Sequence, residues 1–298
     1  MMRHSLIPMA ALMMAGAGGA HAACVTFSAT AINVKYDPLG AQSNSQIVQP
    51  VTLTAGRSSV FGLDVTAQFV DEDSNGTLRI GTSGPTYTIT SNGSGPVVVG
   101  LGAGQLSQGN TFFVPGRGSQ QVNGIQFLID PGQDLPAGVF SESLDMQLRC
   151  GDSSAPVNLQ SNVLQITVDV PSTLKAYLAG TSSNGTLDFG DFSNLTKQAL
   201  VNIQSTGPFG LSIASDGGGV MKLSGAPAAA AGAANAQVGY TMTFNGAAVS
   251  VGSNTHFGRT GIGGLGLPLS VTAESIAGKR AGTYRDTITL TFSPLATL

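Results

Sequence analysis

The amino-acid sequence predicts an all-β protein made of two β-sandwich units. Three observations support this prediction: a composition suited to strands and turns, an internal repeat, and a proline between the two copies. The 298 residues include 41 Gly and 14 Pro but no Trp. Together with many Thr, Ser and Val, this composition is typical of short strands joined by turns.

The first 22 residues, MMRHSLIPMAALMMAGAGGAHA, predict a signal peptide. Arg3 and His4 form a basic start, an apolar stretch covers residues 6–14, and Ala20-His21-Ala22 is a small-residue cleavage site. We expect cleavage after Ala22 or Ala23 and an exported protein. No later run is long and apolar enough to span a bilayer.

Two cysteines, Cys24 and Cys150, come after the signal peptide. In an oxidising compartment they predict one disulfide. The alternative is a lipidated Cys24 at the mature N-terminus. That alternative fits poorly, because His21 stands where a lipobox requires an aliphatic residue and Cys150 would be left unpaired.

An internal repeat relates residues 125–148 to residues 269–292 at a constant offset of 144, without a gap. IQFLIDPGQDLPAGVFSESLDMQL lies over LSVTAESIAGKRAGTYRDTITLTF, so that Glu142 matches Asp286. Three alternating apolar positions also match: Leu144, Met146 and Leu148 in the first copy, and Ile288, Leu290 and Phe292 in the second. The alternation predicts a strand with one buried face in each copy. The run before each strand (125–129 and 267–271) is predicted to be its antiparallel neighbour.

The repeat divides the mature chain into units 23–170 and 171–298. Pro171 lies between them, where a proline removes a ladder donor and marks a boundary. A weaker similarity relates residues 32–37 to residues 187–192. Asn-Gly turns recur at Asn75, Asn92, Asn184 and Asn245. The small-residue run 226–236 is expected to be a loop.

The two copies differ in the segments that come after them. The first continues into NVLQITVDV, where Leu164, Ile166, Val168 and Val170 alternate with polar residues and predict a half-buried strand. The second continues only into SPLATL, so the second unit is expected to be one strand short. A sandwich without its last strand exposes unpaired backbone groups beside a hydrophobic groove, which another strand can fill. Ile288, Leu290 and Phe292 are therefore predicted to accept a donor strand.

These features together resemble the spore coat protein U-like domain family. The resemblance rests on a cysteine soon after the signal peptide, the segments Tyr36-Asp37 and Phe189-Gly190, and the C-terminal AGTYRDTITLTFSP. It implies two immunoglobulin-like β-sandwich domains of the pilin module of archaic chaperone–usher pili. The implied partners are a periplasmic chaperone, an outer-membrane usher and an adjacent pilin subunit that donates a strand.

The same resemblance implies a place at the pilus tip. After cleavage the chain is expected to carry no donor segment before Cys24, so it could receive a strand but not donate one. A complete domain followed by an incomplete one resembles a two-domain tip adhesin that attaches cells to an abiotic or host surface and supports biofilm formation. The alternative is a secreted coat or matrix protein built from the same module.

The surface contact of such an adhesin is expected far from the junction at Pro171, and the segment 96–118 is the candidate for it. Its apolar residues are Val97, Val98, Val99, Leu101, Phe112, Phe113 and Val114. Exposed apolar clusters mark contact surfaces. The alternative is that these short runs are core strands.

The remaining signals argue against other classes of function. Only 10% of residues are charged and the net charge is −3, which does not indicate nucleic acid or an anionic membrane as a partner. DEDSNG (71–76) lacks the glutamate that completes a calcium loop, and GIGGLG (261–266) is expected to be a loop without a nucleotide. His256 is the sole histidine of the mature chain. We therefore expect no enzyme activity, metal or cofactor. A sugar-binding module is disfavoured because Trp is absent.

Overall fold

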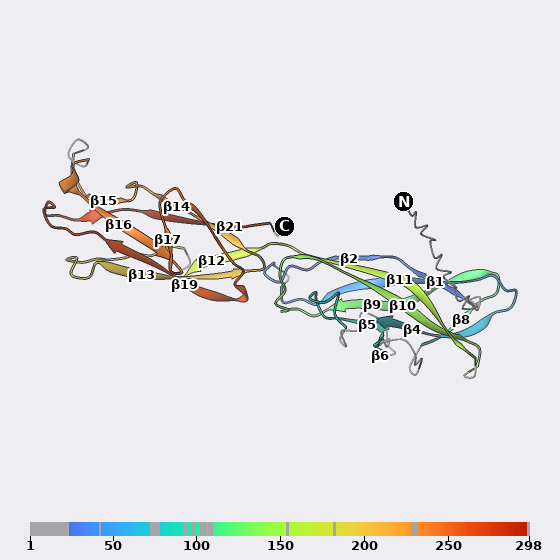
Figure 1. The fold of residues 1–298 in the computed structure, drawn as a ribbon. Helices are drawn as coiled ribbons and strands as arrows, with labels where there is room; N and C mark the ends of the chain where they lie inside the picture. Colours follow the sequence, from blue (N-terminus) through green and yellow to red (C-terminus); the bar gives the residue numbers. More distant parts are fainter. Residues whose placement is uncertain are drawn as a thin grey trace, which may run out of the picture.

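The structure is a computed structural model, and it describes residues 24–41, 43–71, 78–91, 95–96, 99–101, 106, 110–152, 155–180, 183–227 and 232–296. The predicted signal peptide lies outside these residues. The described chain is nearly all β, as predicted, and folds into two β-sandwiches placed end to end (Figure 1). None of its helices is both long and apolar enough to cross a bilayer.

The N-terminal sandwich consists of two sheets. One sheet has the strand order β1-β3-β9-β5-β6, and the other has the order β2-β11-β10-β4-β7, with β8 also paired to β4. The strands span Thr26–Ala29 (β1), Ile32–Lys35 (β2), Ile47–Arg57 (β3), Leu63–Asp71 (β4), Tyr87–Ser91 (β5), Gly95–Pro96 (β6), Val99–Leu101 (β7), Asn110–Val114 (β8), Gly118–Ile129 (β9), Gly138–Cys150 (β10) and Val157–Val170 (β11).

Alternating residues of both sheets fill the core between them. The largest fully buried side chains there are Leu53, Phe69, Ile80, Ile89, Phe127, Ile129, Leu144, Met146, Leu148 and Leu164. In β11, the positions predicted to face inward are buried: Leu164, Ile166, Val168 and Val170. β11 lies between β10, to which it is antiparallel, and β2, to which it is parallel. The last strand of this sandwich is thus held on both sides.

The C-terminal sandwich also has two sheets. Its larger sheet has the order β12-β13-β19-β16-β15-β20, with β17 paired to β16, and its smaller sheet has the order β18-β14-β21. The strands span Leu174–Leu178 (β12), Thr196–Ser205 (β13), Phe209–Ser215 (β14), Val220–Leu223 (β15), Gln237–Phe244 (β16), Ala247–Val249 (β17), Asn254–Phe257 (β18), Gly261–Ala273 (β19), Tyr284–Arg285 (β20) and Ile288–Pro294 (β21). A separate core lies between the sheets, around Phe209 and Phe244.

The register of the strands preserves the sequence repeat. β10 pairs with β4 so that Leu148 lies opposite Ala67, and β21 pairs with β14 so that Phe292 lies opposite Leu211. Both members of the second pair are 144 residues beyond those of the first. The same offset relates Ile129 to Ala273, and each lies opposite a tyrosine of the neighbouring strand, Tyr87 and Tyr240, which are 153 residues apart. The two sandwiches are therefore copies of one topology.

Two local expectations are wrong. The runs 125–129 and 267–271 do not pair with the strands that come after them, because β9 and β10, like β19 and β21, lie in opposite sheets. Strands facing each other across a core alternate in the same way as hairpin strands, so the pattern could not separate the two. GIGGLG forms the start of β19 rather than a loop. The 3-10 turn at Ala234–Ala236 is compatible with the loop expected there.

One expected Asn-Gly turn is found between β16 and β17. Asn245 and Gly246 have φ values of 50° and 78°, which fits the type I′ turn that joins two antiparallel strands. The corresponding turns at Asn75 and Asn92 lie outside the described residues.

The junction between the sandwiches is centred on Thr206, which is fully buried. Its carbonyl accepts a hydrogen bond from the amide of Ala137 in the N-terminal sandwich (2.8 Å), and its hydroxyl donates one to the carbonyl of Pro171 (2.7 Å). The hydroxyl of Ser172 donates to the carbonyl of Leu295, just beyond β21 (2.8 Å). These bonds fix the chain between the two cores.

A charged contact reinforces the junction. Asp134, in the loop between β9 and β10, forms an ion pair with Arg259 of the C-terminal sandwich. The same carboxylate accepts a hydrogen bond from the amide of Ile262 (3.1 Å). The φ of Gly261 is 79°, and a Cβ there would lie 2.8 Å from Asp134, so glycine is required at this close approach.

Candidate functional site

The first candidate site is the edge of β21 that faces away from β14. In the N-terminal sandwich, β10 is paired on one edge with β4 and on the other with β11. β21 occupies the place of β10 and is paired with β14. No strand of the described chain occupies the place of β11, so the second edge of β21 has free backbone groups.

The repeated side chains are fully buried in the N-terminal sandwich but only half-buried in the C-terminal one. Leu144, Met146 and Leu148 are at most 2% exposed. Their counterparts Ile288, Leu290 and Phe292, the predicted acceptor residues, are half-buried and pack against the C-terminal core. The core of this sandwich is therefore accessible along the open edge.

The other wall of this opening is the segment that precedes β13. In the N-terminal sandwich the equivalent segment is β2, which pairs with β11. Residues 184–192 form no strand, and Leu187, Phe189 and Phe192 pack against the core while half-exposed. Phe189 and Phe192 stack at 5.8 Å, and Phe192 has a φ of 60°, which is rare for a bulky residue. A strand inserted beside β21 would lie against these rings.

The repeated carboxylates support loops. Asp286 accepts hydrogen bonds from Tyr240 Oη (2.5 Å), Ser215 Oγ (2.6 Å) and the amide of Gly217 (2.6 Å). Its counterpart Glu142 accepts from the amide of Gly81 (2.9 Å). The matching acidic residues of the repeat are thus structural, since each holds a loop against its sandwich.

The contact between Tyr240 and Asp286 gives a prediction for alkaline pH. Burial and the hydrogen bond to the carboxylate raise the pKa of Tyr240 to about 12, from 10.0. The neutral phenol is favoured in the folded state, so its contribution is fully present below pH 10 and is lost as the pH rises from 10 to about 12. We expect Tyr240→Phe to lower the unfolding free energy by about 1–2 kcal/mol at neutral pH.

Urea unfolding at neutral pH and at the alkaline end of that range would measure both effects. The variant should lose less stability than the parent protein on going to alkaline pH. An equal alkaline loss in the variant and the parent would contradict this role of Tyr240.

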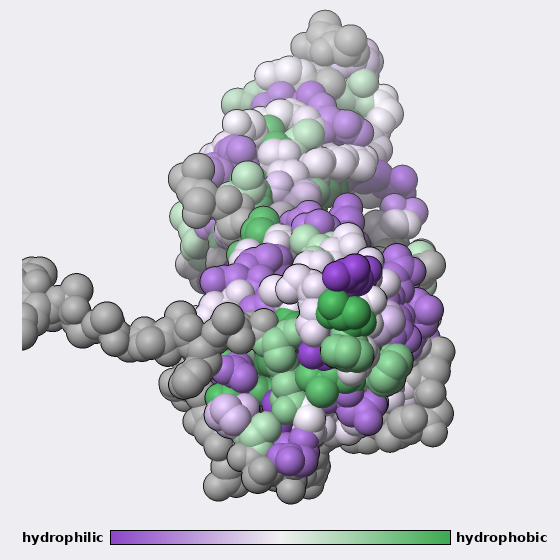
Figure 2. All heavy atoms as spheres, turned by 90° about the vertical axis from the view of Figure 1, so that its right-hand side faces the viewer, coloured by the Kyte–Doolittle hydropathy of each residue, from purple (hydrophilic) through white to green (hydrophobic). Residues whose placement is uncertain are grey.

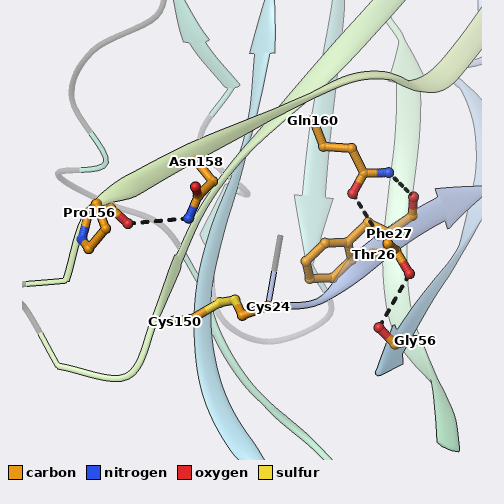
Figure 3. The surroundings of a disulfide bond; sticks show 8 residues. All are labelled: Cys24, Thr26, Phe27, Gly56, Cys150, Pro156, Asn158 and Gln160. Atoms are coloured by element: carbon orange, nitrogen blue, oxygen red, sulfur yellow. Dashed lines mark hydrogen bonds between the residues drawn. A yellow bond between two sulfur atoms is a disulfide. The ribbon is translucent and has the colours of Figure 1, made fainter. Parts of the chain in front are cut away.

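The second candidate site is the pole of the N-terminal sandwich that lies far from the junction (Figure 1). The predicted disulfide between Cys24 and Cys150 is formed there, with 6.4 Å between the Cα atoms, and it joins the start of β1 to the end of β10 (Figure 3). Beside it, the side-chain amide of Gln160 bonds both the amide and the carbonyl of Phe27. The disulfide and these hydrogen bonds hold β1 against the ends of β10 and β11 at this pole.

Exposed apolar side chains gather at this pole, as the end-on view in Figure 2 shows. Phe113 is 59% exposed, and Val60 and Phe61, in the loop between β3 and β4, are 56% and 79% exposed. We call these three residues the distal apolar surface. Their segments are closely packed against each other. The ring of Phe113 lies so close to Gly62, and the carbonyl of Val60 so close to Gly116, that neither glycine has room for a Cβ atom.

The structure corrects the predicted contact surface in part. Val114 is 0% exposed, because β8 pairs with β4 and turns this residue into the core. Phe113 is exposed, so it stays a candidate for the predicted contact. Val97 and Val98 lie outside the described residues, as do the side chains of Val99, Leu101 and Phe112.

Sequence reasoning missed Val60 and Phe61. The available signal was the pair of apolar residues within RSSVFG, a short segment between the polar end of one strand and the start of the next. Asp71, the first residue of the calcium-like DEDSNG, is buried and accepts a hydrogen bond from Tyr87 Oη (3.3 Å). The other residues of that motif are not among those described.

No protein-family model and no curated protein matches this chain. Solved structures that it resembles include the complex of a chaperone with the tip adhesion subunit CsuE from archaic chaperone–usher Csu pili of Acinetobacter baumannii. The identity is 14%, the match covers 90% of this chain and 99% of that chain, and the TM-score is 0.40.

Two further structures are similar to a comparable degree. CfaE, the adhesive subunit of CFA/I fimbria of enterotoxigenic Escherichia coli, is 12% identical, with 90% of this chain and 93% of that chain covered and a TM-score of 0.43. The CupB6 tip adhesin from Pseudomonas aeruginosa is 12% identical, with 90% and 92% covered and a TM-score of 0.39. Because these identities and TM-scores are low, any functional conclusion must rest on the residues of this chain itself.

Proposed function

We propose that this protein is the tip adhesin subunit of a chaperone–usher pilus, which attaches cells to a surface and supports biofilm formation. The C-terminal sandwich accepts a donor strand, and the N-terminal sandwich makes the contact with the surface. The observation that carries the proposal is the open edge of β21, because its half-buried Ile288, Leu290 and Phe292 stand where the first copy is completed by β11.

The fold gives the proposed donor strand a direction. β11 is antiparallel to β10, so a strand that completes the second copy in the same way is antiparallel to β21. Because β21 runs toward the junction (Figure 1), such a strand ends at the opposite pole of the C-terminal sandwich. A subunit that supplies the strand as its own N-terminal extension lies on that side, away from the distal apolar surface.

We propose a place for each partner. A periplasmic chaperone completes the C-terminal sandwich first, an outer-membrane usher receives the complex, and the adjacent pilin subunit then supplies the strand. The protein is exported through the periplasm to the tip of the pilus. Its distal apolar surface meets an abiotic or host surface.

Replacing the exposed aromatic residues tests the adhesive role. We expect cells that carry Phe61→Ser together with Phe113→Ser to attach to polystyrene about tenfold less well, since exposed aromatic residues at the centre of a contact dominate its energy. Pili should be assembled normally, because both side chains are largely exposed. Counts of attached cells and of pili measure the two effects.

Leu265→Ser provides the matched control, since Leu265 is an exposed apolar residue of the C-terminal sandwich. It should leave attachment unchanged. Equal attachment of all three strains would contradict the assigned contact surface. Immunogold labelling along fibres or over the cell, rather than at fibre ends, would favour a coat or matrix protein instead.

A further inference from the structure

We propose that the distal pole of the N-terminal sandwich binds the anionic headgroups of a lipid bilayer, with its arginines contacting phosphate while its apolar side chains enter the interface. This inference rests on the proposed adhesive role of that pole and names the chemical class of surface. Three arginines are involved, Arg57, Arg117 and Arg149, and each lies at the end of a strand or in a turn at the pole.

The first observation is an unpaired guanidinium. Along β3, Val51, Leu53 and Ala55 point into the core, and Arg57 continues the same alternation at the mouth of the sandwich. Its Nε and Nη1 atoms are buried, and no hydrogen-bond partner for them is found in the part of the chain that the structure describes. The side chain as a whole is only half-buried, and an unpaired charge there is unfavourable, so an anion brought to the mouth of the sandwich would lower that cost.

The second observation places another arginine beside it. Arg57 is opposite Gly118 in the ladder of β3 and β9, and Arg117 is the residue before Gly118. The amide of Arg117 donates a hydrogen bond to the carbonyl of Ser59 (2.6 Å), next to Val60 and Phe61. Two guanidinium groups therefore originate from the segments that present the distal apolar surface.

Arg149 extends the basic region onto the neighbouring sheet. It is opposite Thr66 in β4 and Val157 in β11, and Val157 is itself exposed. Its Nε atom is also buried without a partner among the described residues. Asp64, opposite Phe113 in the ladder of β4 and β8, adds a carboxylate, but no ion pair in the described chain joins it to an arginine.

The combination of chemistries indicates a bilayer rather than a small anion. Phe113, Val60 and Phe61 project from the pole, so they are placed to enter the boundary between headgroups and acyl chains. Guanidinium groups bind phosphate through paired donors and gain from the negative potential of an anionic membrane surface. Residues 24–170 contain five Lys or Arg residues against eleven Asp or Glu residues, so the net charge does not favour this partner. What favours it is that the fold gathers three of the five cations at this pole, where Asp64 and Asp152 are the acidic neighbours on β4 and just beyond β10.

Sedimentation with vesicles tests the proposal on the full exported chain. Vesicles of phosphatidylglycerol should bind it, vesicles of phosphatidylcholine should bind it much more weakly, and added salt should weaken the binding. Arg117→Gln should weaken binding to phosphatidylglycerol about fivefold, as expected for one basic residue near an anionic membrane surface. Lys175→Gln, which removes an exposed charge from β12, should have no effect. Arg57→Gln is a second variant, and if it fails to fold, Arg117→Gln decides.

The outcomes separate this inference from the proposed function. Equal binding to both kinds of vesicle, or an equal effect of Arg117→Gln and Lys175→Gln, would overturn the anionic bilayer as partner. Binding of soluble hexyl phosphate without sedimentation on vesicles would also overturn it and assign the site to a free anion. If either occurs while Phe61→Ser together with Phe113→Ser still lowers attachment to polystyrene, the adhesive role stands without the lipid. If attachment is insensitive to that double variant as well, the proposed function fails too.

Discussion

A copy of β11 (Val157–Val170), appended to the C-terminus through a flexible Gly-Ser spacer, is expected to stabilise the C-terminal sandwich by roughly 3 kcal/mol or more. In its own sandwich this strand buries Leu164, Ile166, Val168 and Val170 against β10. Placed beside β21, it would bury the corresponding face over Ile288, Leu290 and Phe292 and pair the free backbone edge. The gain is reduced by the entropy lost in ordering the tail.

Thermal unfolding of the two sandwiches measures this effect. The transition of the C-terminal sandwich should rise by roughly 10 °C or more, and that of the N-terminal sandwich should not move. Hydrogen exchange gives an independent measurement, since amides on the open edge of β21 should become protected.

The control is the same tail with serine at the copies of Leu164, Ile166 and Val168. It has the same length and spacer but cannot fill the groove, so it should leave the transition unchanged. Equal stabilisation by both tails, or by neither, would show that the open edge of β21 is not an acceptor for a strand.

Removal of the disulfide is expected to have the second large effect. Cys24 and Cys150 are separated by 126 residues, and the chain-entropy model assigns a loop of that size about 5 kcal/mol. We expect Cys24→Ser together with Cys150→Ser to lower the unfolding free energy of the N-terminal sandwich by about that amount. Attachment should fall with it, because the bond closes the pole that carries the distal apolar surface.

Reduction of the parent protein with dithiothreitol supplies the comparison. It should reproduce the loss seen in the double variant and have no further effect on that variant. The transition of the C-terminal sandwich should be unchanged in every case, since its core contains neither cysteine. A disulfide that contributes little would leave the two transitions of the double variant where they are in the parent.

The repeat is the feature for which sequence and structure agree most closely. A constant offset of 144 in the sequence reappears as equal registers of β10 with β4 and of β21 with β14. The alternation of Leu144, Met146 and Leu148 predicted a buried face, and that face is buried. Such agreement is expected where a short-range pattern of side chains alone decides which face of a strand points inward.

Some pairings depended on contacts that no local pattern contains. The runs 125–129 and 267–271 had the alternation of hairpin partners. The chain nevertheless crosses to the opposite sheet between each run and the strand that follows it. Val114 had the same apolar character as its neighbour Phe113, and only its register opposite Leu63 directs it into the core. Sequence reasoning selected residues 96–118 as the candidate segment but could not separate the exposed Phe113 from the buried Val114.

The sequence by itself determined the fold class, the repeat and the disulfide, because composition, alternation and cysteine number act over short stretches or by simple count. The tertiary structure decided which surface each residue occupies. Arg57, Arg117 and Arg149 are far apart in the sequence and lie at one pole only because β3, β9 and β10 have ends there. The open edge of β21 is likewise a property of pairing, which exists only once β14 and β21 have come together.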